Sequence, residues 1–138
     1  MSEENLELVE TALAAWNRGE LERFGEHVAE DIVWLEVSGW LENEGQEVRG
    51  RGVLLRNHRQ LLDAWESYQL ELQETHAAPD GVIAVVREVG RGRASGVEVD
   101  SLWGYVITIS DGKICRVEAY RDPAKALGRL PAAPGEAS

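Results

Sequence analysis

Glu36 raises the first chemical question in this sequence, because an acid is placed inside an apolar run. Residues 32–37 read Ile-Val-Trp-Leu-Glu-Val, a composition typical of a β-strand, and Trp34 precedes the acid by two positions. A carboxylate in such a strand is either turned toward water near the strand end or held against apolar side chains for a purpose. Alternation does not decide between the two, because both faces of this strand are apolar.

Two arginines could supply the charge that a buried acid needs. The alternating pattern of the strand predicted over residues 82–92 places Arg87 on an otherwise apolar face that includes Val85, and Arg121 ends a face of the last strand. An unpaired guanidinium in an apolar interior is costly, so a buried one requires a carboxylate or an anionic ligand. The alternatives are that Arg87 and Glu88 form a charge pair on an edge strand, and that Arg121 is a surface or helix-capping residue.

Apolar side chains from several predicted elements could line a pocket around these charges. In the strand predicted over residues 97–110, the odd positions are mostly apolar and include Trp103 and Tyr105, so the odd face should point inward. Each tryptophan could equally be an ordinary core residue. The candidate ligand-binding residues are Trp16, Trp34, Trp103, Val85, Val117 and Arg121.

The elements that must position these residues come in an order of helices followed by strands. Helical spacing of apolar residues predicts helices over residues 2–19, 21–28 and 53–65. Residues 38–52 are polar and rich in glycine, and are predicted to form a loop. From residue 68 the apolar period changes to two, which predicts strands over residues 68–76, 82–92, 97–110 and 113–121. Asp122 and Pro123 then open a short terminal helix.

This order predicts an α+β fold, with the helices on one face of an antiparallel sheet. A strand of about fourteen residues is too long to stay flat, so the sheet should curl round the helices and form a concave apolar face where a pocket can lie. We expect one domain over residues 1–130 and a flexible tail at residues 131–138.

The composition argues against several classes of partner. Of the 138 residues 43 % are apolar, and 25 acidic against 14 basic side chains give a net charge of −11. Such a charge repels phosphate backbones and anionic lipids, so we expect neither nucleic-acid nor membrane binding. The lone Cys115, the acidic first residues and the lack of an apolar run of roughly 20 residues favour a cytoplasmic protein. The histidines are widely scattered, and we expect no metal and no cofactor.

Two segments carry a resemblance to a known family. ETALAAWNRGELERFGEHVAEDIVW near the start and YVITISDGKICRVEAYRDPAKAL near the end are similar to the SnoaL-like branch of the nuclear transport factor 2-like superfamily, and the resemblance covers residues 5–128. It implies a cone, in which a strongly curved sheet wraps over N-terminal helices and encloses a pocket. It also implies a homodimer formed through the outer face of the sheet. The superfamily includes ketosteroid isomerases, polyketide cyclases, dehydratases, epoxide hydrolases and non-enzymatic binding domains, so the fold alone does not fix the function.

The resemblance also implies roles for individual residues. Glu36 lies where the ketosteroid isomerases place their carboxylate base, which implies a base on the first strand that faces the pocket. Their oxyanion-binding tyrosine aligns with Ala12, and their protonated aspartate aligns near Tyr105, whose hydroxyl could donate in its place. With one donor instead of two, steroid isomerisation itself is not expected. The epoxide hydrolases flank an arginine with two aspartates, and Arg87 has no such pair.

Two functions remain open. In the first, Glu36 is a general base that removes a proton next to the carbonyl of a small apolar molecule, with Tyr105 and Arg87 stabilising the enolate oxygen, in isomerase, cyclase or dehydratase chemistry. In the second, the protein is a non-catalytic binding or dimeric structural module in which Glu36 and Arg87 form a structural pair. Exchange of ligand α-protons would distinguish them, because only the enzyme catalyses it.

Overall fold

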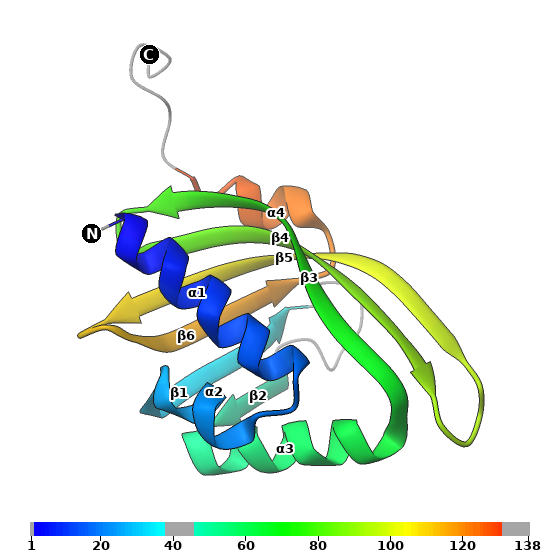
Figure 1. Cartoon of the computed structure of the whole chain (residues 1–138). Helices are drawn as coiled ribbons and strands as arrows, with labels where there is room; N and C mark the ends of the chain where they lie inside the picture. The colour runs from blue at the N-terminus through cyan, green and yellow to red at the C-terminus, as the bar shows by residue number, and fades with distance from the viewer. Residues whose placement is uncertain (1, 38–45, 131–138) are drawn as a thin grey trace.

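The computed structural model describes residues 2–37 and 46–130, and Figure 1 shows the helices and strands that they form. Their bounds are α1 (Ser2–Asn17), α2 (Leu21–Glu26), β1 (Val28–Val37), β2 (Gln46–Arg49), α3 (Arg51–Ala64), β3 (Trp65–Ala78), β4 (Gly81–Gly92), β5 (Glu98–Ser110), β6 (Lys113–Tyr120) and α4 (Pro123–Leu127). Every predicted helix and strand occurs, within a few residues of its predicted ends. The predicted tail at 131–138 and the first part of the predicted loop, 38–45, lie outside the described residues. None of the helices in the described part is long and apolar enough to cross a bilayer.

The described strands form one sheet in the order β2-β1-β6-β5-β4-β3. β3 to β6 are the predicted antiparallel meander, in which each strand pairs with the next. Two features correct the prediction: residues 46–49, expected in a loop, form β2 against β1, and β1 pairs with β6 in parallel. A four-residue polar strand shows almost no periodic pattern, and the pairing of distant segments is not encoded in local alternation.

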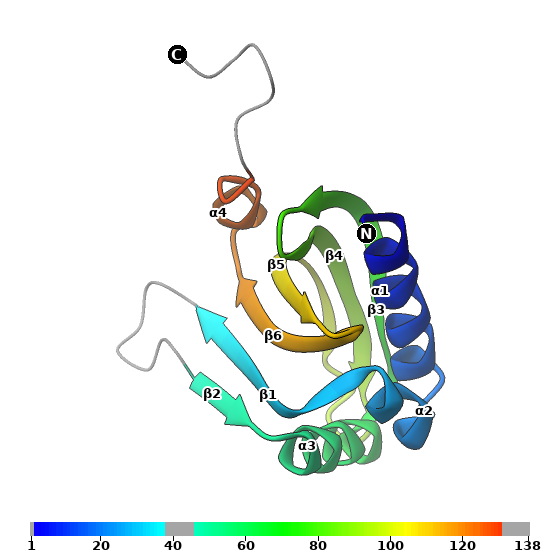
Figure 2. The same ribbon diagram turned by 90° about the vertical axis from the view of Figure 1, so that its left-hand side faces the viewer.

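The sheet is strongly curved, and Figure 2 shows this curvature from the side. Shifts of register between β1 and β6, between β3 and β4, and between β5 and β6 bend the strands, because an extra residue on one strand kinks it locally. α1, α2 and α3 pack on the concave side and α4 packs on the opposite face. The molecule is therefore a mixed α+β structure, consistent with the cone that the family resemblance implied.

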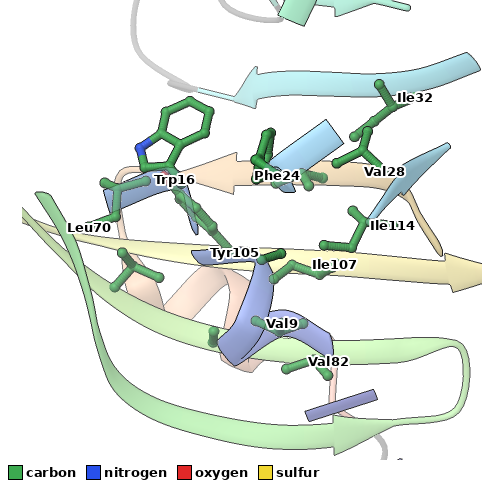
Figure 3. Packing of buried hydrophobic residues seen from close by; sticks show 14 of the residues in the cluster. Val9, Trp16, Phe24, Val28, Ile32, Leu70, Val82, Tyr105, Ile107 and Ile114 are labelled. Atoms are coloured by element: carbon green, nitrogen blue, oxygen red, sulfur yellow. The ribbon is translucent and has the colours of Figure 1, made fainter. Parts of the chain in front are cut away.

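The core fills the concave face beneath α1 and α2. Figure 3 shows Val9 and Trp16 of α1 and Phe24 of α2 among strand side chains such as Tyr105 and Ile107, all members of one buried cluster. Burying each large apolar side chain contributes about 1.5–3 kcal/mol, so this layer fixes α1 on the sheet. Gly19, at φ +72°, ends α1 in a left-handed conformation that lets the chain turn into α2.

β4 is apolar on both faces. The face that points inward is the opposite of the one that its alternation predicted. Val82 and Val86 belong to the core, whereas Val85 is buried on the outer face. Val85 pairs with Gly104, and a Cβ at Gly104 would come within 2.6 Å of the Ala126 Cβ of α4. Because α4 packs this closely on the outer face, that face is apolar as well, and the sequence pattern could not indicate which side points inward.

Candidate functional site

A cavity of about 420 Å³ lies between the concave face of the sheet and helices α1 and α3. Its wall combines aromatic rings, aliphatic side chains and acids. The lining residues are Trp16, Trp34, Glu36, Glu47, Val48, Leu54, Asn57, His58, Leu61, Tyr68, Leu70, Glu88, Trp103, Tyr105 and Ala119. A concave site of this size and composition suits a small organic molecule.

Glu36 opens into this cavity from β1, where its partners in register are Gln46 of β2 and Ala119 of β6. Glu36 is partly buried. Burial raises the pKa of the Glu36 carboxyl, the negative charge of Glu88 raises it further, and Arg121 acts in the opposite direction. A carboxyl with a raised pKa accepts a proton more readily, which is the property that a general base needs.

Glu88 and Tyr68 are two cavity residues that sequence reasoning did not assign to the site. The sequence suggested for Glu88 only the alternative of an edge-strand pair with Arg87, but Glu88 points inward on the same face of β4 as Val86. The Tyr68 hydroxyl and the Trp103 Nε1–H both donate hydrogen bonds to its carboxylate, the second at 3.1 Å. The even positions of β4 do carry a signal, since they are apolar up to Val86 and then acidic, but the outer face is equally apolar over the same stretch.

Two tyrosine hydroxyls lie in this site, and that of Tyr68 donates a hydrogen bond to Glu88. Tyr105 lines the cavity from β5, and burial, followed by the charges of Glu88 and Glu36, raises its pKa. Burial and the hydrogen bond to Glu88 likewise raise the pKa of Tyr68 on β3. Both phenols are therefore protonated donors at physiological pH.

Stacked aromatic rings form the inner wall of the cavity. The Trp16 ring lies 3.6 Å from the His58 ring and 5.9 Å from the Trp34 ring, both nearly parallel to it, and Trp34 meets the Tyr105 ring edge-on at 5.6 Å. His58 of α3 is only 1 % exposed. Burial lowers the pKa of His58 to about 4, partly opposed by the nearby Trp16 backbone, so the imidazole is neutral at physiological pH. Offset and edge-on contacts between rings stabilise such a wall beyond the burial of their area.

Arg87 does not belong to the site, which corrects its assignment as a catalytic candidate. Its side chain lies on the outer face of β4, 43 % exposed, and its guanidinium donates to Asp100 of β5 at 2.8 and 2.6 Å. Glu71 of β3 lies 3.6 Å from the same group. This ion pair raises the pKa of Arg87 and lowers the pKa of Asp100. The carboxylate partner that a guanidinium requires is thus present, but on the solvent side of the sheet.

The remaining candidates divide between the cavity and its surroundings. Trp16, Trp34 and Trp103 line the cavity, and the exposed Arg121 guanidinium lies 5.1 Å above the Trp103 ring. Val117 is a core residue that lines a smaller apolar cavity of about 40 Å³, which shares Trp16, Trp34 and Tyr105 with the larger one. Val85 faces outward beneath α4, so neither valine lines the larger cavity, because one lies deeper in the core and the other on the far face.

The described residues contain no group of three or more His, Cys, Asp or Glu side chains arranged to hold a metal ion. The side chains that meet in the cavity are instead suited to proton transfer and hydrogen bonding. Two carboxyls with electrostatic coupling, two phenols and an indole N–H converge there from β1, β3, β4 and β5.

Comparison with known proteins identifies the family. The model of the SnoaL-like domain family matches residues 9–117. The chain belongs to the SnoaL-like family. This SnoaL-like protein also shares its fold with many solved structures, whereas the comparison with curated proteins gave no match.

Three solved structures illustrate the likeness. An NTF2-like protein from Burkholderia xenovorans LB400 is 26 % identical over 96 % of this chain and 98 % of its own, with a TM-score of 0.72. An NTF2-like protein from Burkholderia thailandensis E264 is 28 % identical over 89 % of this chain and 96 % of its own, also with a TM-score of 0.72. A protein described as a putative polyketide cyclase from Pseudomonas putida KT2440 is 20 % identical over 92 % and 98 % of the two chains, with a TM-score of 0.71, a likeness of fold alone.

Proposed function

We propose that this protein binds a small, largely apolar carbonyl compound in its 420 Å³ cavity and removes a proton next to the carbonyl, with Glu36 as general base. The observation that carries the proposal is the placement of Glu36 in a cavity where burial and Glu88 raise its pKa. An ordinary surface glutamate is too weak a base near neutral pH to take such a proton, and a raised pKa corrects this.

The cavity supplies what the proton transfer needs. The proton leaves the carbon for the Glu36 carboxylate, and the electron pair of the C–H bond moves to the carbonyl oxygen to give an enolate. Tyr105, neutral and buried in the same wall, donates a hydrogen bond to that oxygen. Return of the proton to another carbon isomerises the molecule, and the same enolate can close a ring or expel a leaving group. Arg87 takes no part, because it lies on the outer face.

The aromatic wall positions the substrate and removes water from it. Trp16, Trp34 and Trp103 contribute aromatic surface to the cavity wall. Removal of water strengthens both the hydrogen bond from Tyr105 and the proton affinity of Glu36.

The test is exchange of α-protons for deuterium in a panel of small cyclic ketones and enones, followed by mass spectrometry in D₂O. The unmodified protein should accelerate exchange of at least one compound, and Glu36→Gln should lower that rate about 10²–10⁴-fold, the typical contribution of a general base. Glu10→Gln, an exposed change of the same charge on α1, is the matched control and should retain the full rate. Equal exchange by Glu36→Gln and the unmodified protein would end the proposal.

One observation favours a second candidate function, a binding module without catalysis. Glu88 is already held by Tyr68 and Trp103, an arrangement that also serves a purely structural role. In that case ligands bind and shift the tryptophan fluorescence, but no compound in the panel exchanges its protons faster than in buffer.

A further inference from the structure

The cavity wall is acidic and aromatic at once, and this combination restricts the chemical class of its guest. Among the described lining residues there are three carboxylates, Glu36, Glu47 and Glu88, and neither lysine nor arginine. The one imidazole in the wall is neutral at physiological pH, because burial lowers the pKa of His58 to about 4. An anionic guest would meet three carboxylates in the lining, and the positive charge nearby, the Arg121 guanidinium, lies over Trp103 outside the lining, so an anion is the least favoured class.

Glu88 retains hydrogen-bonding capacity toward the cavity. A carboxylate has about four acceptor sites, and the Tyr68 hydroxyl and the Trp103 indole are the donors that the described residues provide to it. Glu47 differs, since it is paired with Arg49 on β2. The two donors hold Glu88 in place and leave acceptor sites free for a guest.

Two almost fully buried side chains of the opposite wall also have unused hydrogen-bonding groups. Trp16, 6 % exposed, and His58, 1 % exposed, both line the cavity. The Trp16 Nε1–H has no hydrogen-bond partner among the described residues, and the His58 ring nitrogens have none of ordinary geometry, although the Trp16 backbone lies close enough to raise the pKa of His58. Buried groups of this kind are normally satisfied. A guest with polar atoms would satisfy these groups better than a pure hydrocarbon would.

The aromatic rings complete a site for positive charge. Trp16, Trp34, Tyr68, Trp103 and Tyr105 all contribute to the wall, and the negative face of such rings attracts ammonium and guanidinium groups. Trp103 already shows this property, because the Arg121 guanidinium lies 5.1 Å from its centroid. The net charge of −11 adds a long-range attraction for cations.

We propose that the guest of this cavity carries an organic cation, an ammonium group with apolar substituents, held by the Glu88 carboxylate and the faces of the surrounding rings. The inference rests on the proposed function in one respect, that both use this cavity, and it narrows the substrate to a carbonyl compound that bears an amine. The two roles fall on different acids: Glu88 holds the cation and Glu36 takes the proton.

The test compares three probes of nearly the same shape and different charge: choline, its neutral carbon analogue 3,3-dimethylbutan-1-ol, and the anion 3,3-dimethylbutanoate. Binding is followed by the ¹H–¹⁵N NMR signal of the Trp103 indole, whose N–H donates to Glu88. Choline should bind the unmodified protein at least about tenfold more tightly than the neutral analogue and should shift that signal, and the anion should not bind.

Variants then locate the charge that is responsible. Glu88→Gln should lower the affinity for choline about tenfold or more and leave the affinity for the neutral analogue within about threefold. Glu36→Gln should lose proton exchange but reduce choline binding less than Glu88→Gln does, and Glu10→Gln should change neither. The comparison of probes needs no variant, so it stands even if Glu88→Gln fails to fold.

Equal or tighter binding of the neutral analogue, or no binding of choline, would overturn the inference. Neither result bears on the proposed function, because proton exchange of neutral ketones is measured separately. Conversely, selective binding of choline without any proton exchange would support the cation site and contradict the role of Glu36 as a base.

Discussion

The pKa of Glu36 depends on a balance of three influences, namely burial, the charge of Glu88 on β4 and the charge of Arg121 just after β6. Burial and the Glu88 charge favour its protonated form, and Arg121 favours its charged form. The charged carboxylate is therefore less stable in the folded protein than in the unfolded chain. A group kept in an unfavourable state at neutral pH is a cost to stability, of the kind that functional sites often carry.

Because the charged Glu36 carboxylate destabilises the folded protein, we expect Glu36→Gln to be more stable than the unmodified protein at neutral pH. Because the pKa of Glu36 is raised on folding, the native state binds more protons than the unfolded chain, and stability falls as pH rises through the raised pKa. Thermal unfolding at pH 7 should therefore give a melting temperature a few degrees higher for the variant. The advantage should vanish at pH values below the ordinary glutamate range, where both proteins carry a neutral group; a variant that is less stable at pH 7 contradicts the placement of Glu36.

At the scale of elements, α3 contributes a neutral histidine to the stacked wall against α1. His58 has a pKa of about 4 in the folded protein because of burial, whereas an unfolded histidine titrates near 6.5. Between about pH 4 and 6.5, His58 is protonated in the unfolded chain and neutral in the native state. Stability is therefore lost as pH falls from about 6.5 toward 4, up to about 3 kcal/mol from this residue.

His58→Phe keeps a ring against Trp16 and removes the titration. Urea unfolding at a series of pH values should show that the variant loses less stability than the unmodified protein between pH 6.5 and 4. The expected difference across this window is up to about 3 kcal/mol. Identical slopes for the two proteins over that range would mean that His58 is protonated in the native state, and would contradict the stacked neutral wall.

The positions of the elements could be predicted from the sequence, because apolar period and turn residues are local properties. The period of the α1 side chains, the Asp-Gly turn before β6 and the Asp122 cap of α4, whose carboxylate accepts from the Ala124 N–H, all act within a few residues. The parallel pairing of β1 with β6 and the short β2 could not be predicted, because they depend on where distant segments meet.

The site could be predicted only in part, because local alternation does not show which face of a strand points inward. Glu36, Tyr105 and the three tryptophans do line one cavity. Arg87 was assigned to the inner face, with an edge-strand pair of Arg87 and Glu88 as the alternative, because α4 makes the outer face of β4 apolar too. Consecutive residues of a strand point to opposite faces. An error about which face is inner therefore selected Arg87 for the site and left out Glu88.

At the scale of the whole molecule, the outer face of the sheet is a candidate surface for a second copy of the chain. Leu102 of β5 is 50 % exposed there, directly opposite Arg87 in register. We propose that the homodimer implied by the resemblance uses this face. Leu102→Lys should then convert a dimer to a monomer in light scattering, because a lysine at the centre of such an interface would be buried without a partner.

Val53→Lys is the matched control for the dimer. Val53 is 39 % exposed on α3, on the helical side of the molecule, so its replacement should leave the dimer intact. A monomeric unmodified protein, or a Leu102→Lys protein that stays dimeric, would show that this face is not the interface.

The central claim is that Glu36 and Glu88 share one cavity in which the partly buried Glu36 can act as a base. ¹³C NMR titration of the Glu36 carboxyl carbon tests it most directly. The pKa of Glu36 should lie above the ordinary glutamate value, fall in Glu88→Gln, where a repelling charge is lost, and rise in Arg121→Gln, where an attracting charge is lost. An ordinary pKa that neither substitution moves would contradict the account.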